Sequence, residues 1–145
     1  MIKKLYIISA SLSVITLLYL YSCKRDNNDT VDCSTYDYSD CNTFEPTQAK
    51  FNLQLTINAE NMSVPIIIYK GKLEDGEIIV TDSASTKYYD TLLPVDNFYT
   101  ATAKYKKGNL IIIAVDGGKI TKSKKTTCDS VCWDVTTYTA KLKLK

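Results

Sequence analysis

The stretch from Phe51 to Asn58 reads Phe-Asn-Leu-Gln-Leu-Thr-Ile-Asn, with an apolar residue at every second position. Because successive side chains of a β-strand point to opposite faces, this alternation predicts a strand with one buried face and one face in water. The same pattern returns from Tyr99 to Lys106 and from Tyr138 to Lys145. Strands that bury one face are typical of an antiparallel sheet packed on a core.

Further strands are expected between these segments. Val64 to Tyr69 is a continuous apolar run with Pro65 near its start, which predicts a strand buried on both faces or nearly so. Weaker strand patterns occur at Ile78–Val80, Lys87–Leu92 and Leu110–Val115. Turns are expected between strands at Glu74–Glu77, where Gly76 would supply a positive φ, at Lys107–Asn109 and at Asp116–Gly118.

These segments predict an all-β fold, a single antiparallel β-sandwich of about seven strands with turns about every 8 to 12 residues. A closed barrel is the alternative. The sandwich would occupy residues 50–145, after a polar segment of residues 23–49 that is rich in Asp, Asn, Ser and Thr and shows no apolar period.

The first 22 residues have the composition of a secretory signal peptide. Lys3 and Lys4 precede an apolar stretch from Leu5 to Leu20. The end of this stretch, Leu20-Tyr21-Ser22-Cys23, resembles the lipobox of bacterial lipoproteins, in which the cysteine is diacylated on sulfur and becomes the mature N-terminus. An uncleaved transmembrane anchor is the alternative, but the apolar stretch is short and is interrupted by serines.

Removal of residues 1–22 deletes two lysines and no acidic residue, which leaves 16 basic and 16 acidic residues. The mature chain would therefore be formally neutral. Nucleic-acid-binding proteins usually present a cationic excess, so we expect no nucleic-acid partner. The expected partners are a membrane, reached through the lipid anchor, and a protein or glycan.

Four cysteines remain beside Cys23, namely Cys33, Cys41, Cys128 and Cys132. An even number of cysteines in an exported chain predicts disulfides. A metal site is the alternative, although the spacing is not Cys-x2-Cys and the chain has no histidine. Residues four apart in an extended strand lie about 13 Å apart, so we expect bridges that cross from Cys33 and Cys41 to the 128–132 segment rather than two local bridges.

Several of these segments together resemble small lipoproteins of Bacteroidota that carry one transthyretin-like or immunoglobulin-like β-sandwich. The resemblance rests on the lipobox, on Asp40-Cys41-Asn42-Thr43, on Val64-Pro65-Ile66-Ile67-Ile68-Tyr69, on Leu93-Pro94-Val95, on the strand from Tyr99 to Tyr105 and on the late cysteines. It implies an outer-membrane lipoprotein that faces the periplasm or the cell surface. It implies no activity, because its motifs are strand patterns.

The O-glycosylation motif of the same phylum, Asp followed by Ser or Thr and then a small or apolar residue, resembles four triplets of this chain. The resemblance implies glycosylation at one or more of Thr30, Ser83, Thr91 and Ser130. Such short motifs also arise by chance.

The absence of histidine excludes every His-dependent triad and general base. Glu74, Asp75 and Glu77 lie in an expected tight turn. Carboxylates in such a turn are solvated and lack the pocket that shifts the pKa of a catalytic acid. Asp26-Asn27-Asn28-Asp29 lacks the glycine and the bidentate glutamate of a calcium loop. We therefore expect no enzymatic activity, no cofactor and no metal.

Tyr88, Tyr89 and Trp133 are candidate ligand contacts, because aromatic rings near loops stack on sugars or anchor interfaces; the alternative is that they cap the core. The lysines at 104, 106, 107, 122, 124 and 125 are explained by protection of strand edges. The sequence thus predicts a membrane-anchored, non-catalytic interaction or structural module. A glycan-binding accessory of a nutrient-uptake system is the alternative.

Overall fold

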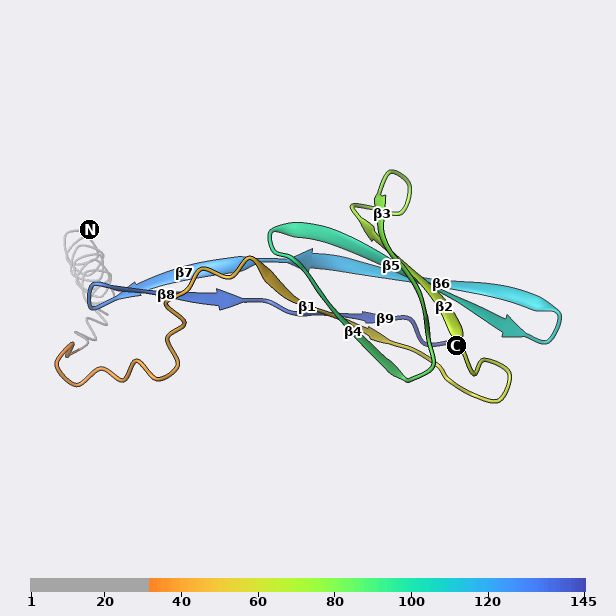
Figure 1. The fold of residues 1–145 in the computed structure, drawn as a ribbon, viewed down its shortest axis with the longest axis horizontal. Coiled ribbons are helices and arrows are strands. Elements are labelled where there is room, and N and C mark those ends of the chain that lie inside the picture. The colour runs from red at the N-terminus through yellow and green to blue at the C-terminus, as the bar shows by residue number, and fades with distance from the viewer. Residues whose placement is uncertain (1–31) are drawn as a thin grey trace, which may run out of the picture. The chain divides into compact units, whose positions relative to one another are not determined.

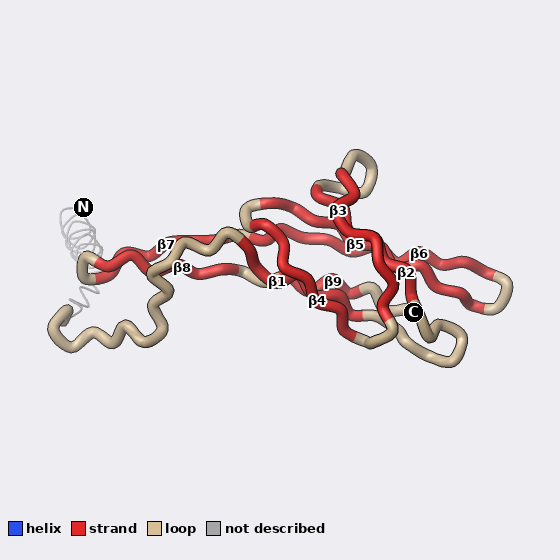
Figure 2. The backbone as a smooth tube through the Cα atoms, in the orientation of Figure 1, coloured by secondary structure: helices blue, strands red, loops and turns tan. Residues whose placement is uncertain are grey.

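The computed structural model describes residues 32–145. The predicted leader of residues 1–22, the lipidation at Cys23 and the glycosylation at Thr30 therefore lie outside the described residues. Two compact units divide the chain, Met1–Ser34 and Thr35–Lys145. Within residues 32–145 every regular element is a strand (Figure 2). This described part holds no helix long and apolar enough to cross a membrane.

The unit Thr35–Lys145 contains nine strands in three sheets (Figure 1). A three-stranded sheet has the order β4-β1-β9, a four-stranded sheet has the order β3-β2-β5-β6, and β7 and β8 form a separate hairpin. The bounds are β1 (Gln48–Gln54), β2 (Val64–Lys70), β3 (Glu77–Ala84), β4 (Tyr88–Pro94), β5 (Asn97–Lys107), β6 (Leu110–Ile120), β7 (Lys122–Thr127), β8 (Ser130–Val135) and β9 (Tyr138–Lys141).

The three-stranded and four-stranded sheets pack on a shared core. Phe51 and Leu53 of β1 are fully buried, as are Ile66 and Ile68 of β2. The remaining fully buried side chains on the inner faces and flanking segments are Val64, Tyr99, Ala101, Ala103, Tyr105, Ile120, Ala140 and Leu142. Each fully buried Leu, Ile or Val contributes about 1.5 to 3 kcal/mol before chain entropy is subtracted. All described core residues lie between positions 49 and 142, within the unit Thr35–Lys145.

The all-β, sandwich-like fold expected from the alternating strands is confirmed. Two details differ from the expectation. The described chain has nine strands rather than about seven, because β7 and β8 were not expected. The sheets are also not wholly antiparallel, because β1 pairs with β9 in parallel, Phe51 opposite Tyr138 and Leu53 opposite Ala140.

The turn expected at Asp116–Gly118 is wrong, because these residues continue β6 opposite Tyr99–Ala101. The two glycines serve close packing instead. A Cβ at Gly117 would lie 2.5 Å from the carbonyl oxygen of Tyr99, and one at Gly118 would lie 2.1 Å from the Tyr138 ring.

The hairpin expected around Gly76 is present, but its positive-φ glycine is Gly71, at φ 107°. Gly76 is required by proximity, since a Cβ there would lie 2.5 Å from the Lys72 carbonyl oxygen. At the β5–β6 turn Gly108 does have a positive φ, 60°.

Candidate functional site

The outward side of the four-stranded sheet exposes a continuous group of apolar side chains. Ile113 is 60% exposed and Val115 is 47% exposed on β6, and Ile67 and Tyr69 of β2 are half-buried. Strand register places these side chains on one side of the sheet, since Ile113 lies opposite Lys104 and Val115 opposite Thr102, which in turn lies opposite Ile67. We call this side the exposed sheet face; its outward strand residues are Pro65, Ile67, Tyr69, Ile78, Thr81, Ser83, Phe98, Thr100, Thr102, Lys104, Lys106, Ile111, Ile113, Val115, Gly117 and Lys119.

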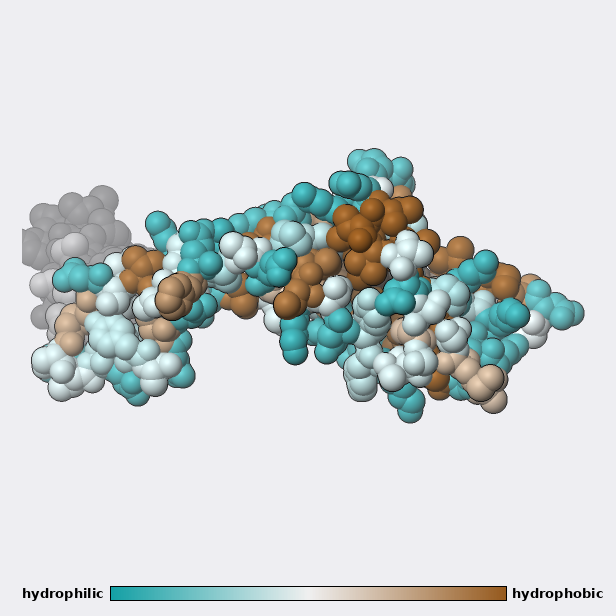
Figure 3. Space-filling view, in the orientation of Figure 1, coloured by the Kyte–Doolittle hydropathy of each residue, from teal (hydrophilic) through white to brown (hydrophobic). Residues whose placement is uncertain are grey.

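The space-filling view shows hydrophobic residues gathered over this sheet, beside the loop that precedes β3 (Figure 3). With strands about 4.8 Å apart and about 3.4 Å per residue, five residues on each of four strands cover about 300 Å² of sheet, polar and apolar positions together. The largest apolar patch of a typical monomer is about 300 to 600 Å² and is often functional. The expectation that β2 is buried on both faces is therefore wrong, because one side of β2 belongs to this open surface.

The charges of the exposed sheet face are all positive. Lys104, Lys106 and Lys119 occupy outward strand positions, and none of the outward strand residues is acidic. Acidic residues lie in loops at its rim, Glu60 before β2 and Glu74 and Asp75 before β3. Glu77 and Asp82 of β3 lie opposite Lys70 and Ile66, at positions of the other side of the sheet.

Lys104 and Lys106 lie on β5 opposite Ile113 and Ile111 of β6, beyond the pairing of β5 with β2, which covers Tyr99–Ala103. Edge protection therefore stays a prediction for these two lysines. Lys124 and Lys125 lie on the two-stranded sheet β7-β8, where edges are open.

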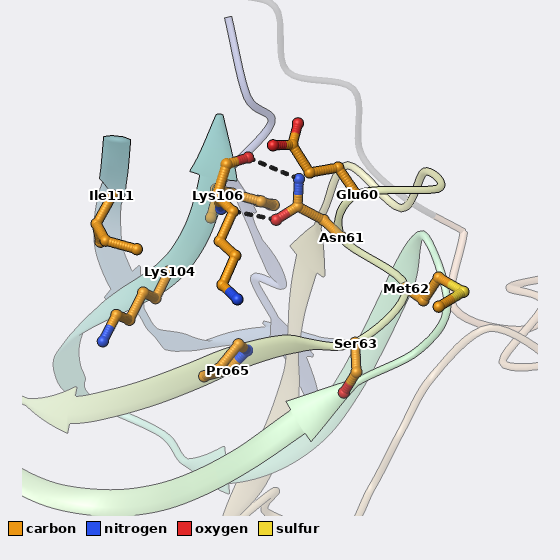
Figure 4. A pocket seen from close by; sticks show the side chains of 9 residues that line it. Glu60, Asn61, Met62, Ser63, Pro65, Lys104, Lys106 and Ile111 are labelled. Atoms are coloured by element: carbon orange, nitrogen blue, oxygen red, sulfur yellow. Dashed lines mark hydrogen bonds between the residues drawn. The ribbon is translucent and has the colours of Figure 1, made fainter. Parts of the chain in front are cut away.

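A hollow of about 440 Å³ lies at the end of the exposed sheet face (Figure 4). Figure 4 shows Lys104 and Ile111 on one side of it and Pro65, Ser63 and Met62 on the other. A second hollow of about 220 Å³ lies over the middle of the sheet and shares Pro65 and Lys104 with the first. The two hollows therefore form one shallow apolar tract with ammonium groups at one end.

The buried Asn61 shapes the wall of the larger hollow. Its Nδ2 donates to the Lys106 carbonyl oxygen at 2.9 Å, and its Oδ1 accepts from the Lys106 amide at 2.8 Å, so the side chain pairs with β5 as a strand would (Figure 4). Glu60 accepts a hydrogen bond from the Gly108 amide at 2.6 Å. These two side chains hold the loop before β2 against the β5–β6 turn, and the sequence patterns did not indicate either role.

The outward side of the three-stranded sheet is polar. Lys50, Asn52, Gln54, Tyr88, Asp90 and Thr139 line a shallow hollow of about 310 Å³ there. Tyr88 is 65% exposed, and Asn52 Nδ2 lies 3.5 Å from Thr139 Oγ1. An exposed phenol ring beside amide, hydroxyl and carboxylate groups offers both stacking and hydrogen bonding.

The three aromatic candidates do not form one group. Tyr88 and Tyr89 are neighbours on β4 and point to opposite sides of the sheet, so Tyr89 packs against the core and donates to Asp82 at 3.0 Å. Trp133 lies on β8, in a different sheet, and the Lys122 ammonium lies 5.6 Å from its ring centroid.

Three of the glycosylation candidates lie within the described residues. Ser83 is exposed on β3, while Thr91 of β4 and Ser130 of β8 are half-buried. Thr91 points inward, opposite Phe51. Glycosylation at Ser83 and Ser130 stays a prediction, and the inward direction of Thr91 makes it the least accessible of the three.

One of the expected crossed bridges is present, between Cys41 and Cys132, with the Cα atoms 5.0 Å apart and a sequence separation of 91. This excludes local pairing of Cys41 with Cys33 and of Cys132 with Cys128. Cys33 and Cys128 are disulfide-bonded as well, so the metal-site alternative does not apply to these cysteines. Among residues 32–145 no three potential ligands gather around a metal position.

The bridge attaches the segment before β1 to the β7-β8 hairpin. The Trp133 amide donates to the Asn42 carbonyl oxygen at 2.8 Å. Lys122 pairs with Glu45 of the same segment and lies 3.8 Å from Asp96 in the β4–β5 turn. The hydrogen bond with Glu45 raises the pKa of Lys122.

Hydrogen bonds from Ser34 and Ser39 lower the carboxyl pKa values of Asp32 and Asp37. Burial raises the pKa of Tyr105 and Tyr99, whose side chains belong to the core.

Comparisons of this chain with protein-family models, with curated proteins and with solved structures find no match.

Proposed function

We propose that the protein is a lipid-anchored module of the outer membrane that acts by binding rather than by catalysis, with the exposed sheet face as its contact surface. The observation that carries the proposal is the composition of this face, which exposes Ile113 and Val115 of the edge strand β6 to solvent and carries lysines without an outward acidic residue. A purely structural sandwich would place polar residues there.

The anchor is supported by the sequence, through Lys3, Lys4, the apolar stretch and Cys23. The absence of histidine supports binding over catalysis. Intact-mass analysis of the protein from its own cells tests the anchor. We expect a chain that begins at Cys23 and carries acyl groups, and a chain that retains Met1 without acyl groups would contradict the anchor.

Photo-crosslinking in cells tests the contact surface. A photoreactive residue replaces Ile113 on the exposed sheet face or Leu92 on the opposite outward side; these are matched positions, 60% and 59% exposed. We expect crosslinked products from position 113 and few or none from position 92. Equal crosslinking from both positions would contradict the proposed contact role.

The glycan-binding alternative is favoured by the polar hollow beside Tyr88. A glycan array probed with the chain from Lys24 to Lys145 tests it, with Tyr88→Ala as the variant and Phe98→Ala, on the exposed sheet face, as the control. Binding that is lost in Tyr88→Ala and retained in Phe98→Ala would support the alternative, and absence of binding by the unaltered chain would exclude it.

A further inference from the structure

We infer that the exposed sheet face lies on a lipid bilayer that contains anionic lipids, with its apolar side chains in the interfacial region and its lysines at the headgroups. This inference rests on the proposed contact role of the face and names its partner. It goes beyond the acyl anchor, because it assigns a second, non-covalent membrane contact to the folded unit itself.

The first argument is the combination of apolar and cationic residues. Ile67, Ile113 and Val115 form the middle of the face, and the charged outward positions, Lys104, Lys106 and Lys119, are all basic. Lysine keeps its ammonium group in water or at a headgroup while its methylene chain lies along apolar surface. A surface whose middle is apolar and whose charged residues are all basic is complementary to an anionic membrane.

The second argument is against a second copy of the chain as the partner of the exposed sheet face. A two-fold interface brings the same patch of both copies together. An interface made of this face alone would hold the lysines of both copies, and no acidic outward residue of the face could neutralise them. Like charges in an interface oppose association, so charge complementarity favours an anionic partner.

The third argument is the shape of the face. Its hollows, of about 440 and 220 Å³, are shallow and adjoin one another through Pro65 and Lys104. Protein interfaces depend on anchoring side chains that fill closed pockets. An open tract suits a fluid surface, and Lys104 and Lys106 line its larger hollow together with Glu60 (Figure 4).

The rim loops limit how the face can lie on a bilayer. Glu74 and Asp75 precede β3 and Glu60 precedes β2. These carboxylates would be repelled by anionic headgroups, so contact is expected over β5 and β6, where the lysines and the most exposed isoleucine, Ile113, lie. Replacement of β6 residues should therefore matter more than replacement of β3 residues.

Vesicle sedimentation with the unacylated chain from Lys24 to Lys145 tests the inference, because this chain contains the complete described core. Vesicles of phosphatidylcholine are compared with vesicles of equimolar phosphatidylcholine and phosphatidylglycerol. We expect binding to the anionic vesicles only. We also expect it to weaken from about 0.1 M to 1 M salt, which shortens the Debye length from about 10 to 3 Å.

Matched variants locate the contact. Lys104→Gln should weaken binding about fivefold, the usual effect of one basic residue near an anionic surface. Lys50→Gln, on the outward side of the three-stranded sheet, should leave it unchanged. Ile113→Ser should weaken binding about fivefold to tenfold, since part of an isoleucine side chain leaves the apolar region, and Leu92→Ser should have no effect. Thermal melting of each variant separates loss of contact from loss of fold.

Three outcomes would overturn the inference. They are equal binding to both kinds of vesicle, equal effects of the two variants in each matched pair, and a dimer in solution that Ile113→Ser dissociates. If crosslinks in cells from position 113 reach only protein, the lipid inference fails while the contact role stands. If position 113 yields no crosslinks, the contact role fails as well.

Discussion

Tyr105 connects the core to two backbone segments through its hydroxyl group. The ring is fully buried, and the hydroxyl donates to the Leu142 carbonyl oxygen at 2.7 Å and accepts from the Thr56 amide at 3.1 Å. A buried tyrosine of this kind joins apolar packing to hydrogen bonding. It holds the ends of β1 and β9 in place from the opposite sheet.

Replacement of Tyr105 by Phe keeps the ring and leaves both backbone groups without this partner. We expect a loss of about 1 to 3 kcal/mol in the free energy of unfolding, measured in urea at pH 7. Tyr88→Phe, at a 65% exposed position, is the control and should change stability by less than about 0.5 kcal/mol. An equal effect of both substitutions would contradict the structural role of the Tyr105 hydroxyl.

The same residue predicts a dependence on alkaline pH. Burial raises the pKa of Tyr105, so the folded protein holds the phenolic proton more tightly than the unfolded chain, in which the pKa is about 10. The resulting stability is fully present below about pH 10 and is lost as the pH rises through the higher folded-state pKa. The difference between the wild type and Tyr105→Phe should therefore shrink above pH 10, and a constant difference would exclude this account.

Gly118 has no room for a side chain. A Cβ would lie 2.1 Å from the ring of Tyr138, which is held by stacking on Phe51 at 5.7 Å and by a hydrogen bond to Asp116 at 3.1 Å. Gly118→Ala should therefore cost about 1 to 3 kcal/mol in chemical denaturation. In a Tyr138→Ser background the same substitution should cost less, and a fully additive double mutant would show that the contact does not matter.

Among the elements, the β7-β8 hairpin depends most on covalent attachment. It forms a two-stranded sheet, which is marginally stable alone, and the Cys41–Cys132 bridge joins it to the segment before β1. Replacement of both cysteines by serine should lower the free energy of unfolding by less than about 4 to 5 kcal/mol, the loop-closure value for a loop of about 90 residues, because Cys33 and Cys128 stay disulfide-bonded.

Hydrogen exchange locates the effect of that replacement. The amides of β7, β8 and residues 35–46 should lose protection, while those of β2 and β5 should keep it below the transition. A variant with serine at Cys33 and Cys128 retains the Cys41–Cys132 bridge and should keep the hairpin protected. Loss of protection throughout the sandwich would contradict a local role.

Strand alternation predicted the main elements but not their partners. The periods at Phe51, Tyr99 and Tyr138 become β1, β5 and β9, because one-sided burial leaves a direct pattern. The parallel pairing of β1 with β9 leaves no pattern in the sequence, since the alternation of a strand is the same whether its partner runs parallel or antiparallel. The hairpin β7-β8 was missed because lysines dominate β7, although Val131, Trp133 and Val135 alternate along β8.

At the scale of the whole molecule, the two outward sheet sides have opposite character. The four-stranded sheet exposes isoleucines and lysines, and the three-stranded sheet exposes amides, Asp90 and Tyr88. The sequence showed the apolar run Leu110–Val115 but not that half of it lies outside the core. That distinction depends on which side of β6 is covered, and coverage is a tertiary property.

The formal charge of the chain from Lys24 to Lys145, 16 basic against 16 acidic residues, affects its behaviour in solution. A protein of near-zero net charge with an exposed apolar face associates readily. We expect light scattering by this chain to be greatest near pH 7 and to fall below about pH 4.5, where carboxylates gain protons. Scattering that is independent of pH would contradict a charge-controlled association.

The pairing of β1 with β9 also has a consequence for biosynthesis. The earliest strand of the sandwich acquires its second neighbour only from residues 138–141, in the latest of the described strands. Until the ribosome has released those residues, Phe51 and Leu53 lack the covering that Ala140 and Leu142 provide. A translation product that stops before residue 138 would therefore keep an open, apolar sheet edge, which proteases and chaperones recognise.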